Sequence, residues 1–158
     1  MNLAREVGRT ARDKGRTVAL AESITGGLAA SLMTDVPGSS DYFLASFVTY
    51  SNDSKSKVLG VRCDTLERYG AVSRQVAKEM ATGARKVAGA DIGASCTGIA
   101  GPGGGSEEKP VGLVFLAIDD GVHVRSERKI YDGDRWAVKS QAAVRLLELL
   151  LKALGPSE

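Results

Sequence analysis

Ser23 is the hydroxyl of this sequence that is best placed for nucleophilic chemistry. It follows the short apolar stretch Thr17–Ala21, a predicted buried strand, and it precedes Gly26 and Gly27 at the start of a predicted helix. A turn from strand into helix presents its side chain at the sheet edge and leaves backbone N–H groups that can hold an oxyanion or a phosphate. Two glycines at a helix start cost about 1 kcal/mol each relative to alanine, which favours close approach of a ligand. The alternative is that Ser23 or Thr25 serves only as an N-cap, and spacing alone does not decide between the two.

A serine nucleophile needs a base, and the sequence offers few. The single histidine, His123, lies in a predicted hairpin strand beside its turn, where a half-exposed structural role is favoured over a Ser-His-Asp triad. Lysine and carboxylate remain as activators. Lys55 follows the predicted strand that ends near Tyr50, and it can act as a base only if burial or nearby positive charge lowers its pKa. The alternative is that Lys55 and Lys57 are solvated surface charges.

A glycine-rich loop after Cys96 is a second candidate site. Thr97 supplies a hydroxyl at its start, and successive backbone N–H groups in such a turn can cradle an anion. The loop is not followed by Gly-Lys-Ser/Thr and does not open a helix with the dinucleotide-binding pattern. A flexible surface loop is the equally open alternative.

Composition narrows the class of protein. The 158 residues carry a net charge of +2, with 21 Lys and Arg against 19 Asp and Glu, a balance that argues against a nucleic-acid-binding protein. Two separated cysteines, Cys63 and Cys96, offer neither a zinc site nor a disulfide framework, and no carboxylate cluster predicts a metal site. No apolar run has the length of a membrane span, and the amino terminus does not read as a signal peptide. We expect a cytoplasmic protein without metal or cofactor.

The order of predicted elements indicates the fold class. Helices are expected over the first dozen residues, over 25–33, after Asn52-Asp53, after Ser73 and from Asp134, and strands over 17–21, 42–50, 91–96, 111–118 and 122–131. In the helix after Ser73, apolar residues including Val87 are expected to share one face. The last two strands form a hairpin that turns at Asp119-Asp120-Gly121. The pattern predicts an α/β fold with a mixed sheet covered by helices on both faces, in one domain over 1–158.

Five segments, taken in order, resemble a known family. They are Ala21-Glu22-Ser23-x-Thr25-Gly26-Gly27, Thr49-Tyr50-Ser51-Asn52, Gly70-Ala71-Val72-Ser73, Thr97-Gly98-Ile99-Ala100-Gly101-Pro102 and Ser106-Glu107-Glu108-Lys109-Pro110-Val111-Gly112. Each is weak alone, but the ordered set strongly resembles the carboxy-terminal domain of the CinA family, also known as nicotinamide-nucleotide amidase (PncC type). The resemblance implies a three-layer α/β/α fold and the stand-alone form of a domain that many relatives carry behind a pyrophosphatase-like domain.

The resemblance also implies an activity and the residues that carry it. Active members hydrolyse the carboxamide of nicotinamide mononucleotide to nicotinate mononucleotide and ammonia without a metal, which recycles pyridine nucleotides. By this resemblance Ser23 is the nucleophile, Lys55 its activating partner, and Tyr50 a residue that relays a proton or orients the lysine. The N–H groups of the Ser23–Gly27 turn are expected to hold the oxyanion. The expected substrate-binding set is Thr25, Gly26, Gly27, Ser40, Thr97, Gly98 and Gly101.

Two other functions stay open at this point. In one, the same turns bind a nucleotide and the domain regulates without turnover; in the other, the protein is an amidase of a different small carboxamide. Ile24 stands where the family often has cysteine, and we expect little effect on the chemistry. We expect the partner to be a small nucleotide substrate, with no nucleic acid or membrane, and we expect the protein to form a homodimer.

Overall fold

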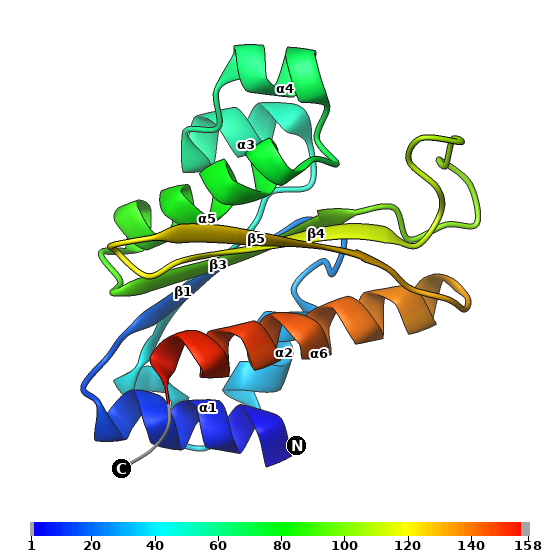
Figure 1. Cartoon of the computed structure of the whole chain (residues 1–158). Helices are drawn as coiled ribbons and strands as arrows, with labels where there is room; N and C mark the ends of the chain where they lie inside the picture. Colours follow the sequence, from blue (N-terminus) through cyan, green and yellow to red (C-terminus); the bar gives the residue numbers. More distant parts are fainter. Residues whose placement is uncertain (1, 156–158) are drawn as a thin grey trace.

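A computed structural model describes residues 2–155 as one five-stranded sheet between layers of helices (Figure 1). The elements are α1 (Asn2–Asp13), β1 (Val18–Glu22), α2 (Leu28–Thr34), the 3-10 helix η1 (Ser39–Asp41), β2 (Phe43–Val48), α3 (Asn52–Leu59), α4 (Cys63–Tyr69), α5 (Arg74–Ala88), β3 (Ile92–Gly98), β4 (Leu113–Asp119), β5 (Val124–Ile130) and α6 (Arg135–Leu154). The strand order is β2-β1-β3-β4-β5. Strand β1 is parallel to β2 and β3, whereas β4 is antiparallel to both of its neighbours. The predicted α/β fold with a mixed sheet is confirmed.

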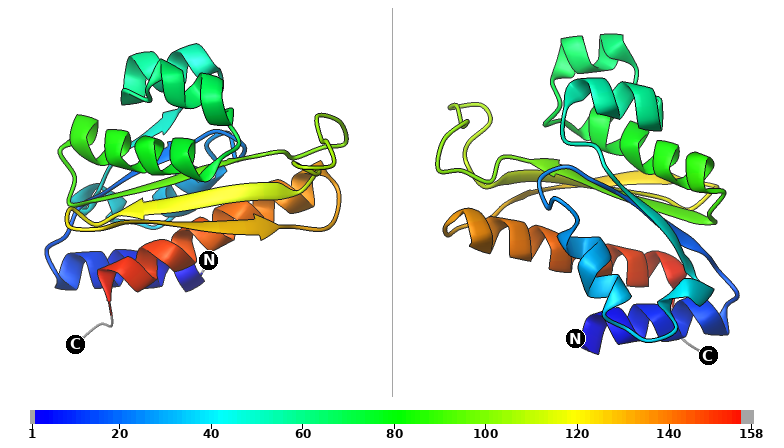
Figure 2. Two further views of the ribbon diagram at one scale, coloured as in Figure 1. Left: turned by 45° about the horizontal axis from the view of Figure 1, so that its top comes forward. Right: turned by 180° about the vertical axis from the view of Figure 1, so that it is seen from behind.

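Different numbers of helices pack directly on the two faces of the sheet. Helix α5 packs directly on one face, and α3 and α4 lie outside it (Figure 1). Helices α1, α2 and α6 form the layer on the other face, with the long α6 running across β3 and β4 (Figure 2). Among residues 2–155, no helix combines the length and the apolar character needed to cross a membrane.

Strand β1 is buried along its whole length, and its alternation decides where the following residues point. Ala19 and Ala21 belong to the apolar cluster under α5, whereas Leu20 belongs to the cluster under the opposite layer. Because side chains alternate along a strand, Glu22 points toward the α2 layer and Ser23 toward the α3 and α5 layer. Adjacent residues therefore serve opposite faces of the sheet.

The structure corrects several predicted boundaries and contacts. Helix α2 begins at Leu28 and not at Thr25, because Gly26 and Gly27 have φ angles of +61° and +98° and form a turn. Helix α4 was not predicted; its seven residues are too short to show a helical apolar period. Val87 was expected on the buried face of α5, yet it is 56% exposed.

The caps of two helices match their predictions, and a third differs. Ser73 accepts a hydrogen bond from Val76 N at the start of α5, and Asp134 accepts one from Ala137 N at the start of α6. Helix α3 is capped by Ser51, one residue before the predicted Asn52-Asp53 cap.

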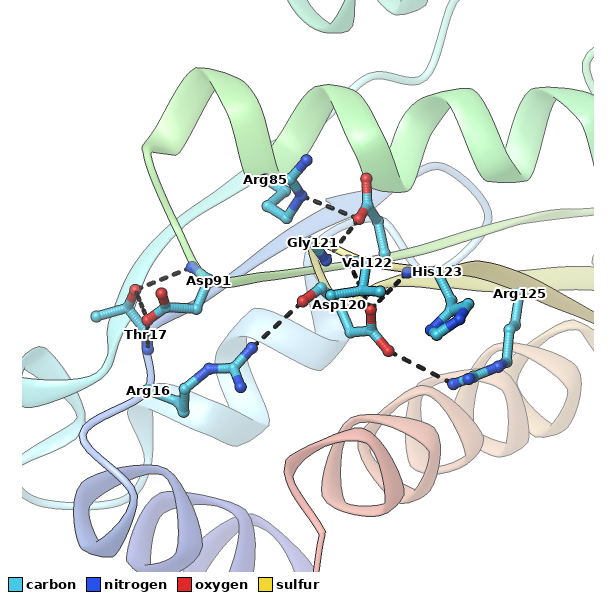
Figure 3. Close-up of polar contacts among 10 residues, drawn as sticks. Arg16, Thr17, Arg85, Asp91, Asp120, Gly121, Val122, His123 and Arg125 are labelled. Carbon is cyan, nitrogen blue, oxygen red and sulfur yellow. Dashed lines mark hydrogen bonds and ion pairs between the residues drawn. The ribbon is translucent and has the colours of Figure 1, made fainter.

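A polar network lies at the end of the sheet where β1 and β3 begin (Figure 3). Asp91 accepts hydrogen bonds from the N–H of Thr17 (2.8 Å) and from its hydroxyl (2.9 Å). The buried Asp119, at the end of β4, forms an ion pair with Arg85 of α5 at 3.0 Å.

The β4–β5 turn belongs to the same network (Figure 3). Asp120 accepts from the N–H groups of Val122 and His123. His123 was predicted to be half-exposed in a strand, but it is exposed and lies in the turn just before β5. Arg16, next to Thr17, donates to Asp120 O at 3.3 Å, and this contact joins the start of β1 to the β4–β5 hairpin.

Candidate active site

Ser23 and Lys55 meet at the carboxyl ends of β1 and β2. Because these neighbouring strands are parallel, the residues that follow them emerge at the same end of the sheet. Ser23 is the first residue after β1, and Lys55 lies on α3, which begins four residues after β2 ends. Their side chains come together with Lys55 Nζ 3.0 Å from Ser23 Oγ, although 32 residues separate them in the chain.

The surroundings of Lys55 favour the neutral amine. Its side chain is buried, with the residue 1% exposed, and within residues 2–155 it has no ion pair with a carboxylate. Burial lowers the pKa of Lys55 to about 8 from its ordinary value near 10.5. The Lys55 amine donates to the carbonyl oxygens of Thr49 (2.8 Å) and Tyr50 (3.2 Å). A neutral amine has two N–H bonds, so with both given to carbonyls its lone pair is left to face the Ser23 hydroxyl.

Glu22 holds the turn that carries Ser23. Its carboxylate is fully buried and accepts from the N–H groups of Gly27 (3.1 Å), Ala29 (3.0 Å) and Ala30 (2.9 Å). The hydroxyls of Thr25 (2.6 Å) and Ser46 (3.0 Å) also donate to it. A carboxylate at this place caps the start of α2 and interacts favourably with the helix dipole.

The cap by Glu22 corrects the expected oxyanion site. The N–H groups at the start of α2 are already paired with a carboxylate, and Gly27 is among them. Ser23 N–H donates to Cys96 O at 3.1 Å, and Gly26 N–H donates to Ser23 O at 3.2 Å. Thr25 N–H interacts with the Cys96 thiol, and Ile24 N–H is the N–H group of the turn 23–27 that has no hydrogen bond to the described part of the chain. Ile24 N–H, directly after the serine, is therefore the donor that this turn can offer an oxyanion.

Thr25 and Cys96 form part of the packing beneath the turn. Thr25 is buried, and its hydroxyl lies 3.1 Å from Cys96 Sγ in addition to its bond to Glu22. Thr25 was expected to bind substrate, but its hydroxyl is already bonded inside the core and is not free for that contact. Burial first, and then the charge of Glu22, raise the pKa of Cys96 to about 12, so its thiol stays protonated and offers no second nucleophile.

The loop after β3 lies beside the turn that carries the serine. Thr97, predicted at the start of the loop, lies in β3; it is buried and donates its hydroxyl to Ala71 O at 2.9 Å, which joins the end of β3 to the segment before α5. Gly98 packs so closely on β4 that an added Cβ would lie 2.6 Å from Leu113 O. Gly101 is buried with φ +83°, and its carbonyl accepts from Arg135 at 2.8 Å.

Tyr50 contributes its backbone carbonyl to the site, whereas its phenol group was expected to contribute. Its backbone carbonyl holds the Lys55 amine, whereas its phenol oxygen accepts from Arg135 at 3.3 Å. The residue is 63% exposed. The phenol is therefore paired with an arginine and not with the lysine that it was expected to relay protons for or to orient.

Arg135 is a site residue that the sequence reasoning missed. It begins α6 and joins the loop of Gly101 to Tyr50. Lys139 follows one helical turn later, and its Nζ lies 3.9 Å from the Cβ position of Gly26. Lys139 thus borders the turn of Ser23, and Arg135 borders Gly101 and Tyr50. Their spacing of four residues after an Asp cap was the signal available in the sequence.

Ser40 lies at the wrong end of the sheet for the expected role within its own chain. It belongs to η1, just before β2 begins, where Phe43 pairs with Val18 at the start of β1. Ser23 follows the other end of β1, so the length of a strand, roughly 15 Å, separates the two serines.

The hydroxyl of Thr49 is a further polar group at this end of the sheet. Thr49 is buried, and its hydroxyl has no hydrogen-bond partner among residues 2–155, so it remains able to bond a ligand or a water molecule. In the same described range, no group of three or more His, Cys, Asp or Glu side chains is arranged to hold a metal ion.

The fold and the site together define a three-layer α/β/α protein with a buried serine–lysine pair at the ends of parallel strands. The chain matches the family model of the CinA C-terminal domain over residues 1–154. It is 48% identical over 154 residues to nicotinamide-nucleotide amidohydrolase PncC of Escherichia coli (strain K12), covering 95% of this chain and 92% of that protein. The chain belongs to the CinA C-terminal domain family.

Other relatives are longer, and solved structures share the fold. A CinA-like protein of Geobacter sulfurreducens is 51% identical over 150 residues, which are 94% of this chain and 36% of that protein. The chain thus spans about a third of the length of several relatives that it matches. The crystal structure of the competence/damage inducible protein CihA from Agrobacterium tumefaciens has a TM-score of 0.93 and 43% identity, covering 96% of this chain and 93% of that one. The competence damage-inducible protein A from Klebsiella pneumoniae has a TM-score of 0.94 at 32% identity, covering 99% and 98%.

Proposed function

We propose that this protein hydrolyses the carboxamide of nicotinamide mononucleotide, with Ser23 as nucleophile and Lys55 as general base. The observation that carries the proposal is the 3.0 Å contact between the Ser23 hydroxyl and a buried lysine whose pKa is lowered to about 8. Such a lysine can take the proton of a serine hydroxyl near neutral pH. The name of the Escherichia coli relative supports the substrate.

The proposed reaction proceeds in two halves. Ser23 Oγ attacks the carboxamide carbon while Lys55 takes the hydroxyl proton, and Ile24 N–H donates to the oxyanion. Lys55 then gives that proton to the amine as the carbon–nitrogen bond breaks, so ammonia leaves and an ester to Ser23 remains. Water attacks the ester, with Lys55 again taking and returning a proton, and the acid is released.

Electrostatics support a cationic pyridinium substrate with a phosphate. A pyridinium near Lys55 disfavours the protonated lysine and so helps to keep the base neutral. Arg135 and Lys139 lie on one face of α6 beside Gly101 and Gly26, where they can bind the phosphate. In this proposal the loop 97–101 shapes the pocket mainly through its backbone. A role in recycling pyridine nucleotides and a cytoplasmic location accord with such a reaction.

The test of the dyad is ammonia release from nicotinamide mononucleotide by the purified protein. Ser23→Ala and Lys55→Ala should each lower kcat by about three orders of magnitude or more. Ser31→Ala and Lys57→Ala are matched controls, because both residues are exposed and lie outside the contact, and they should retain activity. Near-normal turnover by Ser23→Ala contradicts the proposal. Tight binding of substrate and of its acid without turnover by the wild type would show a binding domain instead.

The test of the phosphate contact compares nicotinamide, its riboside and its mononucleotide. The mononucleotide should have the highest kcat/KM. Arg135→Gln should raise KM for the mononucleotide much more than for the riboside, because only the former carries a phosphate. An equal effect on both substrates would assign Arg135 to the shape of the loop rather than to the phosphate.

A further inference from the structure

Thr49 carries a buried hydroxyl without a partner beside the serine–lysine contact. The residue is 1% exposed, and its Oγ1 has no hydrogen bond to residues 2–155. The buried hydroxyls of Thr25, Ser95 and Thr97, near the neighbouring strands, each have one. A buried polar group without a partner destabilises a fold, so its place next to a reactive centre calls for a functional explanation.

The ladder between β1 and β2 places Thr49 beside Ser23. The pairing is regular from Ala45 to Val48, and Val48 stands opposite Glu22. Thr49 N–H then donates to Glu22 O at 3.0 Å. Thr49 and Ser23, each the next residue of its strand, are therefore neighbours across two parallel strands, which lie about 4.8 Å apart.

The side chains of Thr49 and Ser23 lie on the same side of the sheet. Phe47 packs against the apolar cluster under α5, whereas Val48 contacts the turn of Gly27 on the side of α2. Because side chains alternate along a strand, Thr49 points to the side of Phe47, toward α3 and α5. That is the side to which Ser23 also points and on which Lys55 meets it.

The leaving nitrogen of the substrate has to come close to Thr49. In the proposed reaction Lys55 gives a proton to this nitrogen, which therefore lies within about 3 Å of Lys55 Nζ. Nζ itself lies 2.8 Å from Thr49 O. The nitrogen carries two N–H groups that need acceptors in a buried place. The carbonyls of Thr49 and Tyr50 already accept from Lys55, whereas both lone pairs of Thr49 Oγ1 are unused.

We propose that Thr49 Oγ1 accepts a hydrogen bond from the leaving amide nitrogen and makes the site selective for primary amides over esters. This inference rests on the proposed function. The backbone of Thr49 is held by Glu22 and Lys55, so its hydroxyl reaches the nitrogen by a turn of the side chain between staggered positions. No covalent bond changes at Thr49, because the proton of Lys55 goes to the nitrogen as the carbon–nitrogen bond breaks. An ester has a leaving oxygen without hydrogen, so it cannot make this contact.

The test compares kcat/KM for nicotinamide mononucleotide and for the methyl ester of nicotinate mononucleotide. This constant covers the steps up to departure of the leaving group, where the proposed contact acts. Thr49→Val keeps the shape of the side chain and removes the hydroxyl. It should lower kcat/KM for the amide by about tenfold or more and leave the value for the ester within about twofold of the wild type.

Two further variants separate the hydroxyl from the fold. Thr49→Ser keeps a hydroxyl and should keep the preference for the amide. Thr65 is the matched control, since it is also buried but its hydroxyl donates to Glu79 at 2.7 Å. Thr65→Val should lower the urea midpoint of unfolding and leave the ratio of the two kcat/KM values unchanged. Thr49→Val should not lower the midpoint, because no internal hydrogen bond is lost.

Several results would overturn the inference. An equal loss on amide and ester in Thr49→Val would assign the residue to the shape of the site, and an unchanged rate on the amide would show that the hydroxyl is not used. A Thr49→Ser protein as slow on the amide as Thr49→Val would lead to the same conclusion. A fall in midpoint as large as that of Thr65→Val would reveal an internal partner. Failure of the proposed function is recognised separately, since Ser23→Ala would then hydrolyse both substrates at near-normal rates.

Discussion

Each end of the central sheet has a buried ionisable side chain, Asp119 at one end and Lys55 at the other, and their surroundings differ. At the end where β1 and β3 begin, the buried Asp119 is paired with Arg85. Burial alone would raise the pKa of Asp119, but hydrogen bonds from Thr82, from Gly121 N–H and from Arg85 outweigh it and keep the pKa below its ordinary value. At the end where β1 and β2 finish, Lys55 is equally buried but contacts only a hydroxyl and two carbonyls.

The difference separates an anchoring function from a reactive one. A paired buried charge keeps its ionised form and stabilises the fold. Burial of a lysine without an ion-pair partner destabilises its charged form, so the Lys55 amine beside Ser23 loses its proton at a lower pH than an exposed lysine. The first arrangement stabilises the fold, whereas in the proposed mechanism the second gives up stability and supplies a base. The following predictions test this contrast, beginning with the largest effect.

Replacement of Lys55 by arginine should abolish activity while keeping a cation and its donors. A guanidinium is not deprotonated in proteins, so it cannot take the proton of Ser23. We expect kcat for ammonia release to fall by about three orders of magnitude or more. Lys57→Arg, on the exposed face of the same helix, is the matched control and should be unchanged. A Lys55→Arg protein with substantial activity would show that proton transfer does not pass through this side chain.

Replacement of Glu22 by glutamine should loosen the turn of the serine. The amide would place two donors where five donors now converge on a carboxylate. We expect the free energy of unfolding in urea to fall by roughly 3 kcal/mol, since unsatisfied buried groups cost about 1–3 kcal/mol each. Glu67→Gln on the exposed surface of α4 is the control. An unchanged midpoint for Glu22→Gln would mean that the cap does not need a charge.

Replacement of Arg85 by methionine tests the anchoring end. Asp119 would lose its ion pair and keep its bond from Gly121 N–H, so we expect a loss of about 2 kcal/mol in unfolding free energy. The kcat of the folded protein should remain within about twofold of the wild type, because this end holds no reacting group. The exposed pair of Arg62 and Asp64 is the comparison, and Arg62→Met should cost about 0.5 kcal/mol or less. A large loss of kcat in Arg85→Met would contradict the division between the two ends.

The pH profile of turnover should report the pKa of Lys55. Below its pKa the amine is protonated and has no lone pair for the Ser23 proton, so the rate should rise by about tenfold per pH unit and level off above about pH 8. Circular dichroism over the same range controls for unfolding. A rate that is constant from pH 6 to 9 would argue against a lysine base, given the tenfold change per unit that single protonation requires.

Elements that depend on neighbouring residues in the chain could be predicted from the sequence. The alternation of apolar residues, the Ser73 and Asp134 caps and the Asp-Asp-Gly turn predict most elements, because each depends on neighbours in the chain. Ser23 and Lys55 could be proposed separately from their positions at the ends of strands. Their pairing followed from the family resemblance, since no local pattern states that two strands are parallel neighbours.

The failures have a common physical cause. Glu22 was overlooked because its function depends on donors that arrive from a helix start and from β2, and Arg135 because it joins loops from two other segments. The oxyanion prediction was too broad because a free helix start was assumed. Glu22 occupies that helix start, and within the turn 23–27 it leaves Ile24 N–H as the donor. Ser40 was assigned to the site from the order of the motifs in the sequence. That order does not show that β2 is parallel to β1, which puts Ser40 at the opposite end of the sheet from Ser23.

The separation of 32 residues between Ser23 and Lys55 has a consequence for folding. A contact of this span forms only when β1 and β2 have paired, so an incompletely folded chain carries a serine of ordinary reactivity. In the proposed mechanism, Ser23 becomes reactive only when the two strands have paired. A serine-directed acylating probe should label native molecules selectively. During refolding, the return of fast labelling would time the moment at which the two strands join.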